Sequence, residues 1–434
     1  MTSPTASPWH SLLNSSAIAY IPPPKKKNGG CIKNEFYWHP DLLHQWQSLL
    51  KSDDESADDK NNNKSSSSTT TNYASLMLLA VYVADELRRK LSLHHSEANE
   101  QPHSASPSDV SEKIIRDTAN TLRIGMAIPE GPFLPLFVLV IHSLNIAVAE
   151  RWLTVVDDAA NSNKSKWCKG VVLIPIETDE APERLKHIVT DSSPHLILVA
   201  SGDDKMSMAN ALGQSSPTAT TQLVDFIELM ETAFSSISAQ QQQHNNNMDY
   251  YYYSLMDKIW TGDIREIPIE NSSWDVARLV AIGCAMLATT SSGCTSVSPN
   301  YKSSSSLSSH RTIMSHIVYT SGTTGLPKGC ISSLSSLQHY IRAKNVAHEI
   351  NSQSNVMLAS AVTFDPCFSD VLATFWGNGT LCLAPRAMLY GHGDDDDNGG
   401  EVDEDGGNSY RGLTKLLRQL RITHVLCTPT LWAK

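Results

Sequence analysis

The stretch GVVLIPIETDEAPERLKHIVTDSSPHLILVA, residues 170–200, joins two apolar runs through a helical pattern. The runs at 170–176 and 195–200 are continuous apolar segments, which is typical of strands buried on both faces of a sheet. Between them, Pro182 suits the first turn of a helix, and apolar residues then recur on one helical face from Leu185. A strand, a helix and a strand in succession predict an α/β unit with parallel pairing.

The same alternation extends over much of the chain. Further buried strands are predicted at 123–128, 316–320, 355–360, 380–384 and 423–428. Further helices are predicted at 73–91, 133–149 and 410–420. We therefore expect an α/β fold of largely parallel sheets covered by helices, with ligands bound beyond the carboxyl ends of strands.

The longest apolar run, FLPLFVLVIHSLNIAVA at 133–149, raises the question of a membrane span. It is interrupted by Pro135, His142, Ser143 and Asn145, which favours a buried helix over a span. We expect no membrane span in this protein.

The composition limits which partners the protein can have and which cellular compartment it can occupy. The net charge of -11 over 434 residues argues against nucleic acid, which needs clustered Lys and Arg. The eight cysteines are scattered without a CxxC pair, so we expect a reducing, cytoplasmic compartment and no zinc site. The first 34 residues contain no Asp or Glu, which leaves an organelle transit peptide as an alternative, although they also lack Arg.

Polar tracts interrupt the chain without disturbing the order of its apolar segments. We interpret residues 1–34 as a polar N-terminal segment that could remain disordered, and residues 35–434 as one domain with insertions. The insertions are predicted at 51–72, 94–111, 240–247, 302–310 and 394–408. The last of them carries much of the negative charge and is expected to be dispensable for stability.

The stretch YTSGTTGLPKG, residues 319–329, directly follows the predicted strand at 316–320. Its Gly, Ser and Thr residues favour turns over regular structure. Gly322 and Gly325 let the backbone approach an anion closely, the hydroxyl groups add neutral donors, and Lys328 adds a compact positive charge. No Gly-Lys-Ser/Thr sequence follows Gly322, so this is not a Walker loop. The stretch predicts phosphate binding, against the alternative of a plain surface turn.

This stretch resembles the phosphate-binding signature of the adenylate-forming superfamily, the AMP-dependent synthetases and ligases. Acyl-CoA synthetases, luciferases and amino-acid adenylation domains belong to it. Other segments resemble the same family in the expected order, at 73–91, 123–144, 170–200 and 422–432. The resemblance covers roughly residues 35–434 and implies the large N-terminal subdomain of such an enzyme, in incomplete form.

Members of that superfamily activate a carboxylate by attack on the α-phosphate of ATP, so the resemblance implies ATP and Mg²⁺ as cofactors. The resemblance also implies that Lys328 is a catalytic residue, and it implies no protein side chain as a metal ligand. The residues implied to contact the nucleotide are Thr320, Ser321, Gly322, Thr323, Thr324, Gly325 and Gly329.

The segment VTFDPCFSDVLATFWGNGTLCLAPR, residues 362–386, bears on the substrate. Amino-acid adenylation domains carry a Phe-Asp pair whose carboxylate meets the substrate ammonium group, and Phe364 and Asp365 match that pair. A carboxylate in an apolar pocket is costly without a cation, which makes an ammonium-bearing substrate a coherent interpretation. The alternative is a turn-forming Asp before Pro366 that needs no ligand.

The chain ends at TPTLWAK, before the blocks that in the family hold adenine, ribose and the α-phosphate. We therefore expect an incomplete version without the ribose-binding Asp and the C-terminal catalytic Lys, and its status as an active enzyme stays open. The alternatives are an acyl-CoA ligase for a fatty or aromatic acid and a non-catalytic truncated nucleotide-binding protein. The implied partners are ATP, a small carboxylic acid or amino acid, and CoA or a phosphopantetheine carrier protein.

Overall fold

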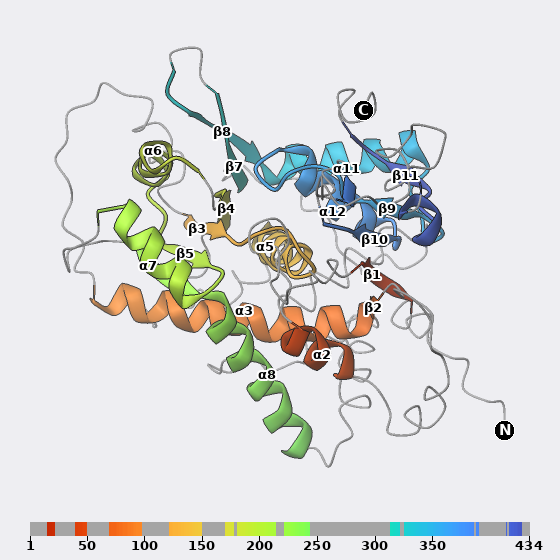
Figure 1. Ribbon diagram of the computed structural model, residues 1–434, viewed down its shortest axis with the longest axis horizontal. Coiled ribbons are helices and arrows are strands. Elements are labelled where there is room, and N and C mark those ends of the chain that lie inside the picture. The colour runs from red at the N-terminus through yellow and green to blue at the C-terminus, as the bar shows by residue number, and fades with distance from the viewer. Residues whose placement is uncertain are drawn as a thin grey trace, which may run out of the picture.

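The computed structural model describes most of the segments in which regular structure was predicted. The described residues are 15–21, 40–49, 69–97, 121–149, 170–177, 180–213, 221–243, 313–321, 325–385, 388–389, 414 and 416–427. They form two sheets separated and flanked by helices (Figure 1).

The larger sheet, sheet B, has six strands. In spatial order they are β6 (Gln222–Asp225), β5 (Leu196–Val199), β3 (Leu122–Ala127), β4 (Val171–Pro175), β7 (Met314–Thr320) and β8 (Lys328–Ser333). All neighbouring pairs are parallel except β7 and β8, which are antiparallel. The predicted parallel α/β architecture is thereby confirmed for this sheet.

The smaller sheet, sheet A, has five strands. In spatial order they are β11 (His424–Val425), β9 (Asn355–Met357), β10 (Thr380–Leu383), β1 (Ser16–Tyr20) and β2 (Thr69–Asn72). Only the pair of β1 and β2 is antiparallel.

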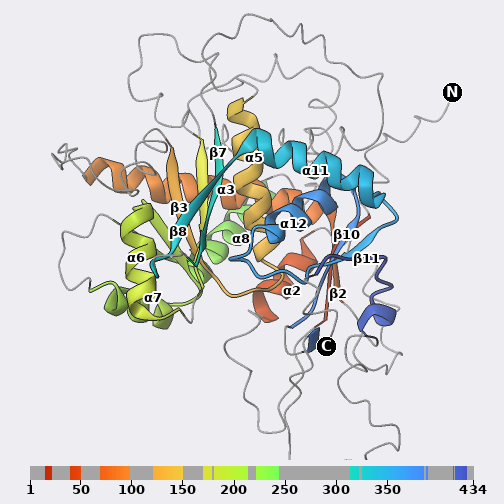
Figure 2. The same cartoon turned by 90° about the horizontal axis from the view of Figure 1, so that it is seen from above.

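Eight helices with defined bounds occur among the described residues. They are α2 (Pro40–Ser48), α3 (Tyr73–Glu97), α5 (Leu134–Ala149), α6 (Pro182–Ser192), α7 (Gly202–Ala211), α8 (Phe226–Gln243), α11 (Leu334–His348) and α12 (Pro366–Trp376). Figure 2 shows α6 and α7 on one side of sheet B, and α5 with α12 between the two sheets. None of the described helices is long and apolar enough to cross a membrane.

The alternation of side chains along each strand divides the core into layers. On β4, Val171 and Leu173 join the central cluster between the sheets, whereas Val172 and Ile174 face α6 and α7. On β10, Cys382 faces away from that central cluster, toward a helical turn that contains Leu416. Buried parallel strands therefore need cover on both faces, and the helices supply it.

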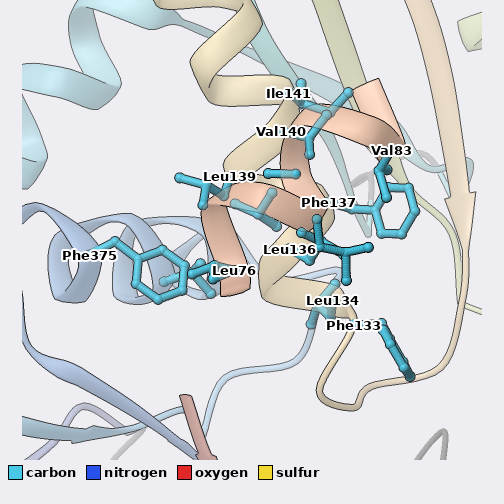
Figure 3. Packing of buried hydrophobic residues seen from close by; sticks show 14 of the residues in the cluster. Leu76, Val83, Phe133, Leu134, Leu136, Phe137, Leu139, Val140, Ile141 and Phe375 are labelled. Atoms are coloured by element: carbon cyan, nitrogen blue, oxygen red, sulfur yellow. The ribbon is translucent and has the colours of Figure 1, made fainter. Parts of the chain in front are cut away.

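Helix α5 fills the central layer because its side chains are apolar on nearly every side. Leu136, Phe137, Val140 and Ile141 are all buried (Figure 3). The ring of Phe137 lies 5.4 Å from that of Phe226 at the start of α8. A helix that is apolar all round is stable only when it is surrounded by protein, which is the position α5 occupies.

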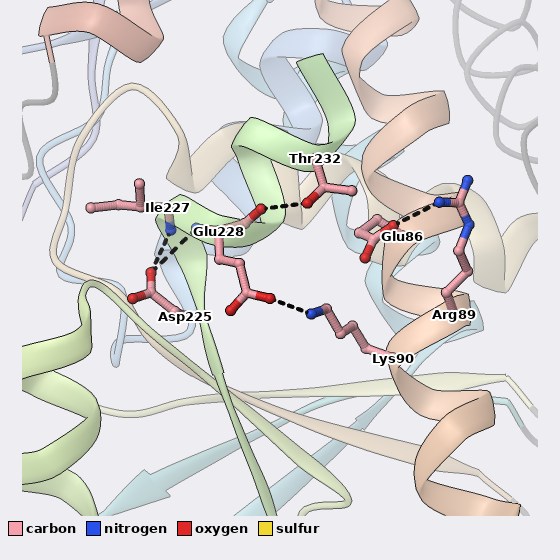
Figure 4. Close-up of polar contacts among 7 residues, drawn as sticks. All are labelled: Glu86, Arg89, Lys90, Asp225, Ile227, Glu228 and Thr232. Carbon is pink, nitrogen blue, oxygen red and sulfur yellow. Dashed lines mark hydrogen bonds and ion pairs between the residues drawn. The ribbon is translucent and has the colours of Figure 1, made fainter. Parts of the chain in front are cut away.

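Polar contacts fix α8 against α3 at the edge of this layer (Figure 4). The Lys90 ammonium group on α3 lies 2.7 Å from the Glu228 carboxylate on α8 and joins the two helices, whereas Arg89 and Glu86, 3.1 Å apart, pair within α3. Asp225 accepts a hydrogen bond from the N–H of Ile227 at 2.8 Å and so satisfies a free donor of the first turn of α8. These contacts set the direction of α8 after β6.

The structure differs from the sequence interpretation at several polar segments. Residues Ser16–Tyr20, assigned to a polar N-terminal segment, form β1 inside sheet A, and Thr69–Asn72, assigned to an insertion, form its antiparallel neighbour. Helices α3 and α8 likewise extend into the predicted insertions, to Glu97 and Gln243. The reason is tertiary: β1 pairs with β10, more than 350 residues away along the chain, and no local pattern reports that partner.

The remaining parts of the predicted insertions at 51–72, 94–111 and 240–247, and all of those at 302–310 and 394–408, lie outside the described residues.

Truncating Phe137 tests the role of the central layer. The Phe137→Ala substitution should lower the free energy of unfolding by about 3–5 kcal/mol, because it leaves a cavity between the sheets. The matched control is Val346→Ala at an 81% exposed position on α11, expected to stay within about 0.5 kcal/mol. Urea denaturation measures both, and equal losses for the two variants would contradict this account of the core.

Candidate functional site

The predicted phosphate loop lies between β7 and β8, at the carboxyl end of β7. Thr320 is paired with Lys328 across the two antiparallel strands, and Tyr319 is paired with Gly329. Thr320, Ser321 and Lys328 are exposed. The pairing therefore brings the hydroxyl side and the cationic side of the loop next to each other at its base.

The loop tip is described in part. Gly325 has φ +87°, a left-handed conformation that favours glycine, with open space where a Cβ atom would lie. Gly322, Thr323 and Thr324 lie outside the described residues. Their predicted contacts with a nucleotide stay predictions.

Two side chains of α6 hold the base of the loop. The Tyr319 hydroxyl donates a hydrogen bond to the Asp191 carboxylate at 2.7 Å, and both residues are buried. Burial, together with the bond to Asp191, raises the pKa of the Tyr319 hydroxyl, which keeps it a neutral donor. On the other side of the loop, His187 Nε2 lies 2.9 Å from the Pro327 carbonyl oxygen. Sequence analysis identified none of these helix contacts.

A buried histidine on β7 contacts the predicted substrate residue. His316 Nε2 lies 2.7 Å from Asp365 Oδ1, and the ring of Phe368 lies 4.8 Å from the His316 ring. The His316 side chain is 2% exposed and that of Asp365 is 66% exposed. The hydrogen bond from His316, which outweighs the opposing effect of partial burial, holds the pKa of Asp365 below its ordinary value. Asp365 is therefore an anchored carboxylate at the surface rather than one enclosed in an apolar pocket.

Successive side chains of β7 point to opposite faces of sheet B, so the strand contacts α6 on one face and the central cluster on the other. Ile317 and Tyr319 point toward α6, whereas Val318 belongs to the central cluster, so His316 and Thr320 share the central side. Four residues along a strand span roughly 13 Å, which sets the scale between the Asp365 contact and the end of β7.

Asp365 occupies a defined position at the start of α12. Its backbone precedes Pro366, the first residue of the helix, but its side chain makes no capping hydrogen bond. The backbone of Asp365 thus lies where the alternative of a turn-forming Asp places it, just before Pro366. Its carboxylate, however, contacts His316. Phe364, the other predicted substrate residue, is 47% exposed beside it.

Helix α12 is held by a buried ion pair to α11. Lys344 contacts Asp370, and Lys344 Nζ also lies 3.2 Å from the Ser369 hydroxyl. Burial raises the pKa of Asp370, and the Lys344 charge opposes this shift. Since a buried charge without its partner is strongly destabilising, the pair constrains the position of α12 and hence of Asp365.

A contact between loops brings the two sheets together at this edge. The carboxylate of Glu130, just after β3, accepts a hydrogen bond from the N–H of Val362 at 3.2 Å. Val362 lies in the segment between β9 and α12. The carboxyl ends of β3 and β9 therefore border one region, as expected for a ligand site in a parallel sheet.

A second histidine, His142 on α5, lies in the core near His316. It is 2% exposed, and neither of its ring nitrogens has a hydrogen-bond partner among the described residues. Burial, with a smaller effect from His316, lowers the pKa of His142 to about 3. His142 is therefore neutral at physiological pH and adds no competing charge beside His316.

Among the described residues, no group of three or more His, Cys, Asp or Glu side chains is arranged to hold a metal ion.

Comparison with known proteins identifies relatives of this chain. The sequence pattern of the family described as AMP-binding enzyme matches residues 167–395. The delta-poly-L-ornithine synthetase of Acinetobacter baumannii is 29% identical over 118 residues, which cover 27% of this chain and 8% of that protein. The nonribosomal peptide synthetase tpzA of Aspergillus terreus is 28% identical over 116 residues, 27% of this chain and 4% of that protein. The matches thus span a small part of these curated relatives.

Solved structures were compared as well. A four-domain nonribosomal peptide synthetase bound to AMP and glycine is 14% identical, with a TM-score of 0.43, and the match covers 90% of this chain and 17% of that one. VinN in complex with 3-methylaspartate is 14% identical, with a TM-score of 0.42, and the match covers 84% of this chain and 60% of that one.

The pair of His316 and Asp365 predicts a specific dependence of stability on pH. A carboxyl group whose folded pKa lies below its ordinary value of 3.8 stabilises the fold above that value, and the contribution is lost as the pH falls through the folded pKa. Asp365→Asn should therefore lower the melting temperature slightly at pH 6, since the group is largely exposed, and the difference should vanish toward pH 3.

Thermal melts of wild type and Asp365→Asn between pH 7 and pH 3 measure this effect. The control is Glu231→Gln at an exposed position on α8. A difference that persists or grows toward pH 3 would show that the charge on Asp365 does not stabilise the fold.

Proposed function

Because the chain belongs to the AMP-binding enzyme family, we propose that it serves the ATP-dependent activation of a carboxylic acid, an amino acid, as an acyl-adenylate. The observation that carries the proposal is the pairing of Thr320 with Lys328 at the exposed carboxyl end of β7. It gives hydroxyl donors and a cation to one anion site.

The proposed reaction transfers the adenylyl group from ATP to the acid. A carboxylate oxygen attacks the α-phosphorus, the bond from that phosphorus to the bridging oxygen of the β-phosphate breaks, and pyrophosphate leaves with the electron pair. Negative charge thus accumulates on the departing β- and γ-phosphates. Lys328, with the donors of the loop, stabilises that charge, and a positioned cation does this most effectively where water is partly excluded.

Mg²⁺ is proposed as the counter-ion of the triphosphate. Exposed hydroxyl oxygens at Thr320 and Ser321 are hard ligands of the type that Mg²⁺ accepts together with phosphate oxygens. When bound, the ion would neutralise part of the phosphate charge.

Asp365 is proposed to bind the ammonium group of the amino acid. Its Oδ1 is held by His316, and no other partner of its side chain is found among the described residues, which leaves Oδ2 for a ligand. The exposed Phe364 adds apolar surface next to it. An anchored carboxylate loses little rotational freedom on binding, which favours recognition of a small cation.

A second candidate function is favoured by the same contact. Since His316 already meets Asp365, the carboxylate could be satisfied within the protein, and the substrate would then be an uncharged fatty or aromatic acid. Under both functions the activated acyl group passes to CoA or to a phosphopantetheine carrier protein. A reducing, cytoplasmic compartment is proposed, in line with free cysteines at 330, 382 and 427.

Replacing Lys328 tests the phosphate site. Lys328→Ala should weaken the binding of MgATP and of magnesium pyrophosphate by roughly tenfold or more, because hydrogen bonds to charged groups contribute about 1.5–3 kcal/mol. Lys205→Ala removes the same charge from an exposed position on α7, which contacts β5 and β6 at the opposite edge of sheet B from β7 and β8, and should leave affinity unchanged. Titration calorimetry measures all three proteins, and equal affinity of wild type and Lys328→Ala would refute the proposed site.

Replacing Asp365 separates the two candidate functions. With an amino acid and its des-amino analogue as paired substrates in ATP–pyrophosphate exchange, Asp365→Ala should lower kcat/KM for the amino acid by about tenfold more than for the analogue. The physical reason is that only the amino acid loses a partner for its ammonium group. Parallel losses for both substrates would point to the acyl ligase, with Asp365 in a structural role.

A further inference from the structure

We propose that His187 on α6 is a positioning residue of the phosphate loop, which sets the orientation of the Lys328 backbone toward ATP; the proposal rests on the proposed function of that loop. Figure 2 shows α6 beside β8, and the two elements are in contact. His187 makes its contact with the loop one residue before Lys328.

The two α6 contacts are arranged to grip both sides of the loop at once. His187 and Asp191 are four residues apart, so they lie on one face of α6 and about 6 Å apart along its axis. Neighbouring strands are separated by about 4.8 Å, a similar spacing. Asp191 can therefore hold Tyr319 on β7 while His187 holds Pro327 before β8.

These contacts lie next to the pair of residues that forms the base of the loop. Tyr319 precedes Thr320, Pro327 precedes Lys328, and Thr320 is paired with Lys328. Helix α6 is itself fixed to sheet B by Leu185, Ile188 and other apolar side chains of the cluster that contains Tyr319. The loop base is thus attached to a rigid element on both of its sides.

Because Pro327 precedes Lys328, its contact with His187 also sets the orientation of the Lys328 backbone N–H. A proline has no N–H, so the carbonyl is the only backbone hydrogen-bonding group of Pro327, and a carbonyl can only accept. His187 Nε2 must therefore carry the proton and donate it. The Pro327 carbonyl and the Lys328 N–H belong to one planar trans peptide and point in opposite directions. Holding the carbonyl toward α6 directs the Lys328 N–H away from α6.

A fixed peptide plane matters most for a residue with a long, flexible side chain. The Lys328 side chain is exposed, and ordering it around a phosphate costs conformational entropy. A backbone already set in the binding orientation lowers the remaining cost of ordering the site. His187 is only half-buried, so its hydrogen bond to the Pro327 carbonyl is its clearest contribution.

The test uses the 434-residue chain with MgATP and magnesium pyrophosphate as probes. His187→Leu removes the donor and should weaken binding by about fivefold, the effect expected from one lost hydrogen bond. His187→Gln places an amide N–H the same number of bonds from the backbone and should restore affinity to within about twofold. His44→Leu, the same change at an exposed position on α2, should have no effect.

A double-mutant cycle separates positioning from a general effect on the fold. If the peptide held by His187 acts by presenting the Lys328 side chain to the phosphate, His187→Leu should weaken binding by less than about twofold when Lys328 is already Ala, because Ala keeps the backbone but lacks the ammonium group. Hydrogen exchange gives a readout that needs no ligand: amides at 328–331 should exchange faster in His187→Leu than in wild type, and His187→Gln should restore their protection.

The outcomes separate this proposal from the proposed function. The positioning role alone would be overturned by either of two results. In the first, wild type binds the probes and neither His187 variant changes the affinity. In the second, the loss of affinity in His187→Leu adds fully to the loss in Lys328→Ala. Absence of any binding by wild type would contradict the proposed phosphate site. In that case unchanged exchange at 328–331 in His187→Leu would also overturn the claim that His187 holds the loop, and faster exchange would support it.

Discussion

The structure depends on one packing constraint, the need to cover two largely parallel sheets with a shared apolar layer. Helix α5, apolar around nearly all of its circumference, packs against β4 and β7 of sheet B and against α12, and α12 in turn packs against β10 of sheet A. Once α5 is enclosed, sheet A and sheet B are held with their strand ends at a common border. The Glu130 to Val362 hydrogen bond then joins the two loops across that border.

Strand β7 links the two faces of sheet B to the candidate site at its exposed end. Its side chains alternate between two environments, so Tyr319 is committed to α6 and His316 to the segment before α12. The exposed end of the strand, at Thr320, is thereby connected to two rigid layers. A site that binds a highly charged ligand benefits from such support, because donors that are already oriented need not reorganise when the ligand arrives.

Buried polar contacts are concentrated around this border. The Lys344 and Asp370 pair fixes α12 to α11, and the neutral His142 lies beside His316 without a charge of its own. Burying a charge is costly unless it is paired, a condition that Lys344 and Asp370 meet together, and His142 avoids the cost of a buried charge by staying neutral. The position of Asp365 at the surface is thus determined by contacts made below it.

The sequence by itself determined the strands and helices whose patterns are local. The strand at 122–127, the helix that starts at Pro182 and the buried helix α5 follow from apolar runs and helical periodicity. The composition of 319–329 predicts turns over its whole length, which is wrong at both ends, because 319–320 belong to β7 and 328–329 to its antiparallel partner β8. Only the tertiary structure decided that Ser16–Tyr20 belongs to sheet A, because its partner β10 is distant in sequence. It alone placed His316 against Asp365 and His187 against Pro327. A histidine in a strand or on a helix face carries no local signal of its partner, since hydrogen bonds between side chains are set by how the layers pack.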